Sequence, residues 1–311
     1  MARKKVLVVG GTGYLGQHLL QALEATAYEI AFSYHSSPSP DHPLFRRFPG
    51  FQVDLGPGDG LDSISQRFGR PDVVVNCAAI SVPRLCEKSP SIAMSVNAPA
   101  VLVDWMNPNT EKKSLLIHLS TDQVYEGAKP FYREDDETRP VNVYGQSKVA
   151  AEQLITGNQP NFAILRSSII IGAQSVSPAP KALPIQWIDG VLAKGEPAEF
   201  FHDEFRCPVY VKDVVSVILF LIQKWLSDEE EMKLVLNVGG PDRVSRAQMA
   251  EVVAEVRGYD TSLIKAVSAS SVDRGVSSPQ DISMSIEKLI TTTNIRPTSF
   301  LDGVKLTFEF A

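Results

Sequence analysis

VLVVGGTGYLGQHLLQAL, residues 6–23, carries the strongest structural signal in the chain. An apolar run at 6–9 leads into three glycines, Gly10, Gly13 and Gly16, and an amphipathic segment follows. A side chain at either of the first two glycines would block a tight turn or a pyrophosphate, and one at Gly16 would hinder packing of a helix on the sheet. The helix N-terminus offers amides and partial positive charge to phosphates. The pattern therefore predicts a strand, a dinucleotide-binding turn and a helix.

Further β-branched runs follow at intervals that leave room for a helix between them. Runs that are apolar on both faces are typical of a parallel sheet covered by helices on each side. The expected strands are 6–9, 29–34, 51–55, 72–79, 115–120 and 162–172. The sequence thus predicts an α/β fold with a doubly wound parallel sheet of the Rossmann type.

Repeated Pro, Ser and Gly residues break the regular texture after Gly172. We place the domain change there: residues 1–172 form the dinucleotide-binding domain, and 173–311 form mainly a smaller C-terminal substrate-binding domain. The segment 211–240 combines a helical pattern with LVLNVGG and is expected to return to the first domain. A capping box followed by a glycine predicts a helix over 245–258.

The composition of the chain indicates which kinds of partner and which cell compartment to expect. The 311 residues carry a formal net charge of −6 without long blocks of one sign, so we expect neither nucleic acid nor a membrane as partner. The longest apolar stretch falls short of the ~20 residues that span a bilayer. Three cysteines without CxxC spacing, and scattered histidines, predict no disulfide framework and no metal site. We expect a cytoplasmic protein that acts on a small-molecule substrate and can form a homodimer.

The segment after the second expected strand bears on the choice of cofactor. An acid that holds the adenosine ribose 2′-hydroxyl is expected about 20 residues after the glycine turn, and none is present. Ser33, His35 and Ser36 would instead offer donors to a 2′-phosphate, which favours NADP(H) over NAD(H). Asp54 suits a contact to the adenine amino group, although turn chemistry before Gly56 explains it equally well.

Tyr144 and Lys148 stand at i and i+4, so both side chains project from the same face of a helix. A tyrosine has an ordinary pKa of about 10, and a neighbouring ammonium favours the phenolate. An ordinary surface pair is the alternative interpretation. Thr121, however, follows an expected strand, which places a hydroxyl at the carboxyl edge of the sheet, where such folds bind ligands.

Motifs that resemble one family occur in order over nearly the whole chain. They are VGGTGYLG at 9–16, VDL at 53–55, NCAA at 76–79, CEKSPSIAMSVN at 86–97, STDQVYEG at 120–127, VYGQSK at 143–148, FRCPVYVKDV at 205–214, SPQDISMS at 278–285 and NIRPTSFLDGV at 294–304. With these motifs the chain resembles an extended short-chain dehydrogenase/reductase, and most closely the dTDP-4-dehydrorhamnose reductase branch.

The resemblance implies roles for single residues. Thr121 matches the catalytic Ser/Thr, Tyr144 the proton donor, and Lys148 the residue that binds the nicotinamide ribose and lowers the pKa of the tyrosine. Asn97 matches the asparagine of the active-site helix, and Arg206 a residue that often lies near the substrate diphosphate. The candidate cofactor residues are Gly10, Thr12, Gly13, Tyr14, Leu15, Gly16, Ser33, His35, Ser36, Asp54, Leu55, Cys77, Ala78, Ala79, Tyr144 and Lys148. The candidate substrate residues are Ser81, Thr121, Gln123 and Arg206.

The implied activity is reduction of a nucleotide-linked 4-keto-deoxysugar, with hydride from NADPH and a proton from Tyr144. Two departures bear on the substrate: Ser278 stands where the branch usually has Arg before proline, and Cys207 follows Arg206. Two alternatives remain open. One is an NADP-binding regulatory subunit that resembles that of methionine adenosyltransferase, and the other is a short-chain reductase or epimerase of another carbonyl substrate.

Overall fold

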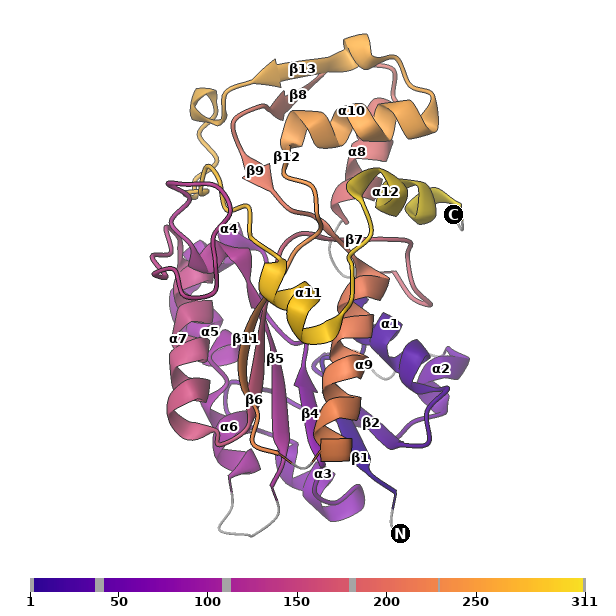
Figure 1. The fold of residues 1–311 in the computed structure, drawn as a ribbon, viewed down its shortest axis with the longest axis vertical. Coiled ribbons are helices and arrows are strands. Elements are labelled where there is room, and N and C mark those ends of the chain that lie inside the picture. The colour runs from indigo at the N-terminus through magenta and orange to yellow at the C-terminus, as the bar shows by residue number, and fades with distance from the viewer. Residues whose placement is uncertain (1–2, 37–41, 108–112, 179–182, 229, 310–311) are drawn as a thin grey trace.

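The computed structural model describes residues 3–36, 42–107, 113–178, 183–228 and 230–309. Within these residues, seven parallel strands form one sheet in the order β11-β6-β5-β4-β1-β2-β3 (Figure 1). The strands are β1 (Lys5–Val9), β2 (Glu29–Tyr34), β3 (Gly50–Gln52), β4 (Val73–Asn76), β5 (Leu115–Thr121), β6 (Phe162–Ser167) and β11 (Lys233–Val238). The strand order reverses beside β1, and open α/β sheets bind ligands at such a switch point.

Every strand predicted from the sequence is present, and the doubly wound α/β fold is confirmed. Three boundaries differ by more than one residue. The run 72–79 gives β4, which ends at Asn76. The run 51–55 gives a strand of three residues, because Asp54 already forms a turn in which its side chain accepts a hydrogen bond from Gly56 N. The run 162–172 divides after Ser167, and β7 (Ile170–Ile171) leaves the sheet to pair with β10 (Val209–Tyr210).

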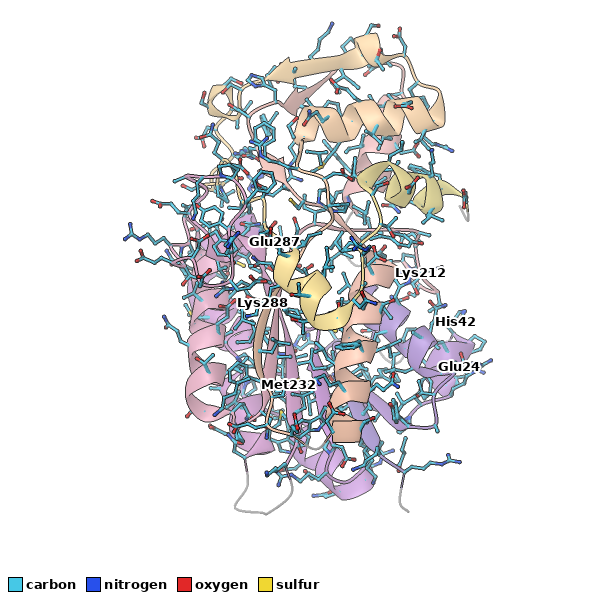
Figure 2. The ribbon with its side chains drawn as sticks, viewed as in Figure 1. Glu24, His42, Lys212, Met232, Glu287 and Lys288 are labelled. Atoms are coloured by element: carbon cyan, nitrogen blue, oxygen red, sulfur yellow. The ribbon has the colours of Figure 1, made fainter. Side chains whose placement is uncertain are left out.

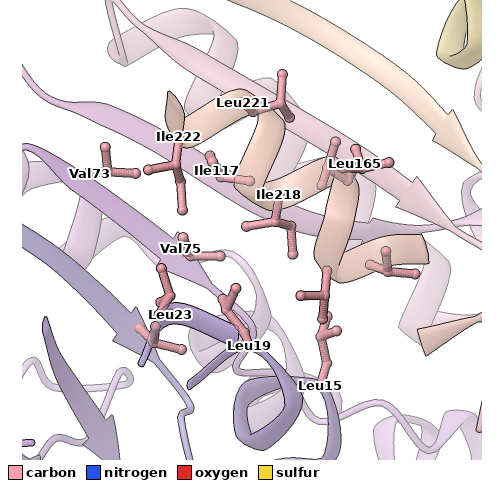
Figure 3. Packing of buried hydrophobic residues seen from close by; sticks show 14 of the residues in the cluster. Leu15, Leu19, Leu23, Val73, Val75, Ile117, Leu165, Ile218, Leu221 and Ile222 are labelled. Atoms are coloured by element: carbon pink, nitrogen blue, oxygen red, sulfur yellow. The ribbon is translucent and has the colours of Figure 1, made fainter. Parts of the chain in front are cut away.

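Helices cover both faces of the sheet. Apolar side chains of α1 and α9 pack on one face, and those of α3, α6 and α7 on the other. These helices are α1 (Tyr14–Leu23), α3 (Leu61–Arg67), α6 (Ala100–Met106), α7 (Val143–Asn158) and α9 (Val211–Asp228). Figure 3 shows side chains of α1 and α9 meeting over the strand residues Val73, Val75, Ile117 and Leu165. Each buried aliphatic side chain stabilises the fold by about 1.5–3 kcal/mol, so the helices hold the sheet rigidly beneath the site.

A smaller upper layer lies beyond the carboxyl ends of the strands, at the top of Figure 1. It has an apolar cluster of its own, to which α8, α10 and α12 contribute. Its elements are α8 (Pro184–Leu192), β8 (Ala198–Phe201), β9 (Phe205–Arg206), β12 (Val244–Ser245), α10 (Arg246–Arg257), β13 (Ile264–Val267) and α12 (Phe300–Phe308). The predicted helix over 245–258 is confirmed as α10: Ser245 and Gln248 form the capping box, and Gly258 has a φ of 71°.

The remaining elements are short. They are α2 (Pro43–Arg46), α4 (Pro83–Lys88), α5 (Pro90–Asn97), α11 (Glu287–Thr293) and the 3-10 turns η1 (Asp122–Val124), η2 (Thr261–Leu263) and η3 (Ala269–Ser271). Leu289 of α11 packs into the same cluster as α9. We propose that the upper layer is the substrate-binding domain and that α9, β11 and α11 belong with the sheet. No helix in the part of the chain that the structure describes is both long and apolar enough to cross a membrane.

A seam of backbone hydrogen bonds joins the two layers. We use this name for the segment 278–285 together with the loop 127–132, which follows β5. The bonds run from Asp281 N to Gly127 O (3.1 Å), from Tyr132 N to Ser283 O (2.8 Å) and from Phe205 N to Gln280 O (2.8 Å). Beyond the seam the chain enters α11, whose first residues Glu287 and Lys288 lie in front of the sheet in Figure 2. The seam therefore fixes the upper layer to the outgoing end of β5.

A buried ion pair attaches α7 to the sheet. Arg166 on β6 and Glu152 on α7 are each about 8% exposed, and Arg166 Nη2 lies 2.7 Å from Glu152 Oε2. Arg166 also donates to the Tyr125 hydroxyl (2.9 Å), and the Ser120 hydroxyl donates to Glu152 (2.5 Å). Removing one partner of such a pair leaves the other charge buried without compensation.

We expect Arg166→Met to lower the free energy of unfolding by about 3–5 kcal/mol, because Glu152 is then buried without its cation. Urea denaturation followed by circular dichroism measures this change. Lys224→Met is the matched control, since Lys224 pairs with Asp228 on the surface of α9, and its transition midpoint should stay where it is in the wild type. A midpoint for Arg166→Met that equals the control would contradict the prediction.

Candidate active site

In the glycine turn between β1 and α1, the backbone atoms of different residues lie in close contact with one another. Gly10 has a φ of 77°, which glycine adopts without strain. A Cβ atom at Gly16 would lie 2.3 Å from the carbonyl oxygen of Gly10, so α1 starts this close to the turn only because Gly16 lacks one. Gly13, the N-cap, has no side chain to cap the helix, and the first turn carries no acid. The N-terminus of α1 therefore suits an anion.

Two residues support the glycine turn from the neighbouring strands. Gly10 N donates to the hydroxyl of Ser33 (3.3 Å), and Ser33 is buried. The backbone of Ala78 approaches within 2.9 Å of the position that a Gly10 Cβ would take. Ser33 thus helps to hold the turn in place. The other predicted cofactor residues lie in the turn and the start of α1 (Thr12, Tyr14, Leu15), after β3 (Leu55) or after β4 (Cys77, Ala79).

A histidine and an acid lie together beyond β2 and β3. The side chain of His35 is 70% exposed, and its Nε2 lies 3.5 Å from Asp54 Oδ2. The other oxygen of Asp54 accepts from Gly56 N (2.9 Å), which is the turn chemistry expected from the sequence. Ser36 is exposed beside His35. The contact between His35 and Asp54 joins the ends of two neighbouring strands, which spacing along the chain does not reveal.

Thr121 and Tyr144 meet at the carboxyl end of β5. Thr121 is the last residue of this strand, and Tyr144 is the second residue of α7, whose N-cap Asn142 accepts from Gly145 N (2.9 Å). The side chain of Thr121 interacts with that of Tyr144, both residues are buried, and the Thr121 hydroxyl donates to Asp122 Oδ1 (3.1 Å). Burial raises the pKa of Tyr144 above its ordinary value, and the interaction with Thr121 acts against this rise. The phenol therefore carries its proton at neutral pH.

Lys148, which the sequence predicts to lower the pKa of Tyr144, is buried beside a histidine. Lys148 lies one turn further along α7 and is 1% exposed, and its Nζ lies 3.1 Å from His118 Nε2. Burial lowers the pKa of Lys148 to about 8, although Glu152 and Cys77 act in the opposite direction. Burial also raises the pKa of the Cys77 thiol to about 12. In the protein without cofactor, the ammonium form of Lys148 is therefore less favoured than in water, and its nitrogen contacts His118.

Asn97, the last residue of α5, is fully buried and hydrogen-bonded on both sides of its amide. Its Oδ1 accepts from Ile80 N (2.7 Å), and its Nδ2 donates to Ile80 O (3.0 Å) and to Ser147 Oγ (2.9 Å). Asn97 thereby ties the loop after β4 to α7. It positions Tyr144 and Lys148 through this loop and helix, and its amide is fully used by the protein.

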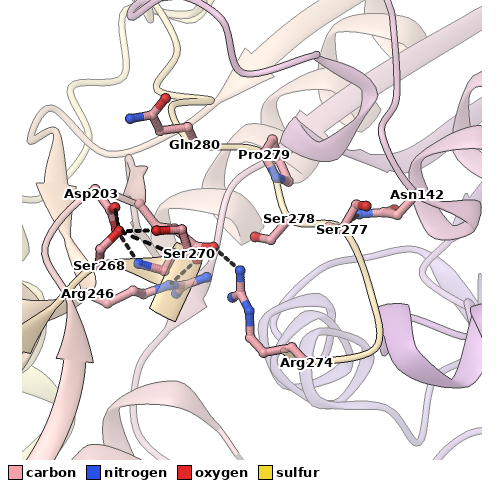
Figure 4. A network of polar contacts seen from close by, with 12 residues as sticks. Asn142, Asp203, Arg246, Ser268, Ser270, Arg274, Ser277, Ser278, Pro279 and Gln280 are labelled. Atoms are coloured by element: carbon pink, nitrogen blue, oxygen red, sulfur yellow. Dashed lines mark hydrogen bonds and ion pairs between the residues drawn. The ribbon is translucent and has the colours of Figure 1, made fainter. Parts of the chain in front are cut away.

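A cavity of about 390 Å³ lies between α7 and the upper layer. Trp187 of α8 lines it from above. Arg206, Arg246 and Arg274 also line it and surround one carboxylate, that of Glu204. Arg274 Nη2 lies 2.5 Å and Arg246 Nε 3.8 Å from this carboxylate, and Figure 4 shows both arginines in the surrounding polar network. Burial and the charge of Arg206 lower the pKa of Arg246 to about 10.

The cavity keeps an excess of positive charge. Arg84 and Glu199 at its edge offset each other. Asp122, which is buried beneath the cavity and interacts electrostatically with Arg206 and Arg246, offsets only one further arginine. A second, more polar hollow of about 540 Å³ adjoins the first and shares residues 276–278 with it. The arrangement suits an anionic ligand.

Arg206, which the sequence places near the substrate anion, is committed to the protein. It is 2% exposed, its Nη1 donates to Phe205 O (2.7 Å), and its Nη2 donates to Pro279 O (3.0 Å) and to Ser278 Oγ (3.2 Å). Arg206 therefore braces the seam. Gln123 lines the cavity, whereas Ser81 lies in the loop just before the lining residues 82–84.

Sequence reasoning did not identify Arg246 and Arg274. Arg246 begins a helix whose apolar stripe reads as core, and Arg274 lies in an irregular segment. Neither residue stands near a motif, so only the fold brings them together.

Comparisons with known proteins agree with this fold and site. The family model described as RmlD substrate binding domain matches residues 4–310. The probable low-salt glycan biosynthesis reductase Agl14 of Haloferax volcanii is 30% identical over 88% of this chain and 87% of its own. Methionine adenosyltransferase 2 subunit beta of Pongo abelii is 28% identical over 97% of this chain and 86% of its own.

A solved structure shares the fold over the full length. It is the dTDP-4-dehydrorhamnose reductase of Bacillus anthracis in complex with NADP, with a TM-score of 0.80, 20% identity and coverage of 100% of both chains. Together, the family match and the reductase relative settle the class. The chain belongs to the RmlD substrate binding domain family, and it is an NAD(P)-dependent oxidoreductase of the short-chain dehydrogenase/reductase type.

Proposed function

We propose that this protein is an NADPH-dependent reductase of a nucleotide-linked 4-keto-deoxysugar, similar to dTDP-4-dehydrorhamnose reductase. One observation carries the proposal. The hydroxyl of Thr121 and the phenol of Tyr144 interact at the carboxyl end of β5. Gln123 and Asn142, each two residues away from one of them, line the cavity with excess positive charge, and the glycine turn after β1 suits a dinucleotide.

The residues present fit a dinucleotide. The glycine turn and the uncapped N-terminus of α1 would hold its pyrophosphate, and residues 77–79 would pass beneath its ribose. Lys148 would donate to the hydroxyls of the nicotinamide ribose. His35 and Ser36 would face the 2′-phosphate of NADP, and the structural neighbour from Bacillus anthracis holds NADP. When bound, the cofactor supplies the hydride that reduces the substrate carbon.

The side chains of this protein would act on the substrate oxygen. Thr121 would donate a hydrogen bond to the carbonyl oxygen and so orient it. Tyr144 would transfer its phenolic proton to this oxygen as negative charge develops there. Because burial keeps the phenol protonated, Tyr144 is ready to act as a donor. Asn97 would hold α7 at the required distance.

Reduction can be tested directly. The purified protein is incubated with NADPH and dTDP-4-dehydro-6-deoxy-L-mannose, the loss of NADPH is followed by absorbance, and the reduced sugar is identified by mass spectrometry. Parallel reactions contain NADH or other nucleotide-linked 4-keto sugars. We expect turnover with NADPH. Binding of NADPH without reduction of any of these sugars would reject the proposal.

The positive cavity supports a sugar nucleotide as substrate, because its diphosphate is an anion. Arg246 is the better candidate for this contact, since its side chain is 31% exposed and lies 3.8 Å from Glu204, whereas Arg206 is fully engaged. A hydrogen bond to a charged group contributes about 1.5–3 kcal/mol. Arg246 and Arg274 together would hold the two phosphates.

We expect Arg246→Met to raise the KM for the sugar nucleotide by about 10–100-fold, because one charge-assisted contact is lost, and to change kcat little. Initial rates at saturating NADPH measure both constants. Arg257→Met is the control: it changes the same helix, but Arg257 contacts Asp189 outside the cavity. The assignment is wrong if Arg246→Met and Arg257→Met have the same KM.

A second candidate function rests on the relatives. The relative from Pongo abelii matches 97% of this chain and is named as a subunit of methionine adenosyltransferase. A regulatory subunit would hold NADP without turnover. Purification from the source cell separates the two functions, since a stoichiometric enzyme partner supports regulation. Bound NAD that is not released would instead support an epimerase.

We also propose that the protein is a cytoplasmic homodimer. All three cysteines are free, which suits a reducing compartment. Leu85 of α4 and Ile92 of α5 expose about half of their side chains, and Met94 exposes 37%. An apolar surface of this kind supports contact with a second copy. Light scattering on the purified protein measures the oligomeric state.

A further inference from the structure

Three buried polar side chains form a line beneath the catalytic residues. Asn76 ends β4, His118 lies in β5 and Lys148 lies on α7, and each is at most 1% exposed. Asn76 Nδ2 lies 3.2 Å from His118 Nδ1, and His118 Nε2 lies 3.1 Å from Lys148 Nζ. In the sequence His118 reads as a satisfied core residue, and the proposed reduction assigns it no role.

The direction of these hydrogen bonds is set at one end. Ala78 N donates to Asn76 Oδ1 (3.1 Å), and a backbone N–H can only donate. The oxygen of Asn76 is therefore used here, so its amide nitrogen faces His118 and donates to Nδ1. A neutral imidazole carries one hydrogen. In His118 this hydrogen must then be on Nε2, the nitrogen that faces Lys148.

The ring of His118 is neutral. Burial and the nearby Lys148 lower the pKa of His118 well below its ordinary value. Its Nε2–H therefore faces Lys148 Nζ as a donor. An ammonium group has three donors and no acceptor, whereas an amine has a lone pair. The contact at 3.1 Å is favourable only when Lys148 is an amine.

Other groups around Lys148 act on the same equilibrium. Glu152 lies one turn further along α7 and favours the ammonium, but it is already paired with Arg166. Cys77 after β4 also favours the ammonium, although its own thiol stays protonated. Tyr144, one turn earlier, is uncharged at neutral pH. Desolvation disfavours the ammonium, and the Nε2–H of His118, which points at Lys148 Nζ, disfavours it further.

We propose that His118 is a positioning residue that presents its Nε2–H to Lys148 and thereby favours the free amine of Lys148 in the cofactor-free protein. Asn76 and the backbone of Ala78 fix the orientation of the ring. For catalysis the inference rests on the proposed function: Lys148 gains its proton when the anionic cofactor binds, because a nearby anion favours the ammonium. The positive charge on Lys148 then increases when the cofactor binds.

The protonation of Lys148 can be measured without substrate. The protein is labelled with lysine carrying ¹³C at Cε, whose chemical shift reports protonation of Nζ, and Lys148→Met identifies the signal. We expect a midpoint near pH 8 in the wild type. His118→Asn keeps a partner for Asn76 but removes the donor near Lys148, and the midpoint should rise by about one pH unit, a tenfold change. His118→Gln keeps an N–H at the Nε2 position, and its midpoint should stay close to that of the wild type.

An unchanged midpoint in His118→Asn would overturn the proposal, and so would a lower one, which would mean that His118 accepts a hydrogen bond from the ammonium. Should His118→Asn fail to fold, Asn76→Leu provides the same test. It frees the ring to carry its hydrogen on Nδ1, so the midpoint should rise, and an unchanged midpoint would again overturn the proposal.

Proton uptake on cofactor binding is measured by calorimetry with NADPH in two buffers of different ionisation enthalpy at pH 8.5. We expect proton uptake in the wild type and similar uptake in His118→Gln, whereas His118→Asn, which is already largely protonated at this pH, should take up clearly less. Equal uptake in the two variants would contradict the inference. Absence of NADPH binding would instead contradict the proposed function, so the two failures are distinguishable.

Discussion

Tyr144→Phe is expected to lower kcat by about 10²–10⁴-fold, the usual contribution of a positioned proton donor. The substitution removes only the hydroxyl. Because Tyr144 is buried and its hydroxyl interacts with Thr121, phenylalanine keeps the ring packing and loses the proton. NADPH consumption with the keto-sugar measures the loss, and fluorescence titration with NADPH should give an affinity close to that of the wild type.

Tyr28→Phe is the matched control for this prediction. Tyr28 directly precedes β2, at the opposite end of the strand from the site, and packs against the core of α1 and α9. Removal of the Tyr28 hydroxyl should leave kcat unchanged. Turnover by Tyr144→Phe at the rate of Tyr28→Phe would mean that another group protonates the substrate, or that Tyr144 does not face it.

Gly16→Val is expected to weaken NADPH binding by about 100-fold or more, because the turn would no longer present its amides to the phosphates and two charge-assisted hydrogen bonds would be lost. A Cβ atom there would lie 2.3 Å from Gly10 O and 2.8 Å from Gly11 Cα, both backbone atoms that cannot rotate away. Fluorescence titration measures the Kd.

Gly157→Ala serves as the control. Gly157 lies near the end of α7, and a Cβ atom there would meet nothing within 4 Å. Its Kd for NADPH should match the wild type, and its helix should gain stability, since alanine favours a helix over glycine by about 1 kcal/mol. A Kd for Gly16→Val within threefold of this control would show that the glycine turn does not hold the cofactor.

The sheet could be predicted from sequence because parallel strands buried on both faces leave continuous apolar runs. Capping signals likewise predicted α10 from Ser245 and Gln248. The paired strands of the upper layer have only two residues each in β9 and β12 and four each in β8 and β13. Strands this short show no hydrophobic periodicity. The sequence therefore indicates a change of composition after Gly172 but does not predict how the strands of the upper layer pair.

Part of the candidate site could likewise be predicted from the sequence, and part could not. Thr121, Tyr144 and the glycine turn were predicted because each stands at a fixed distance from a strand or helix end. The contact of His35 with Asp54, and that of His118 with Lys148, join different elements across the sheet. Side chains on neighbouring strands meet through register, which linear spacing does not report. The arginines around Glu204 converge for the same reason, from α10 and an irregular segment.

The seam constrains how the molecule can open. Hydrogen bonds along 278–285 hold the upper layer to the loop after β5, so that layer cannot separate from the sheet on this side without breaking several of them. If the cavity widens, the seam would therefore act as the hinge. The largest displacement would then occur on the side of α8, where Trp187 is 52% exposed.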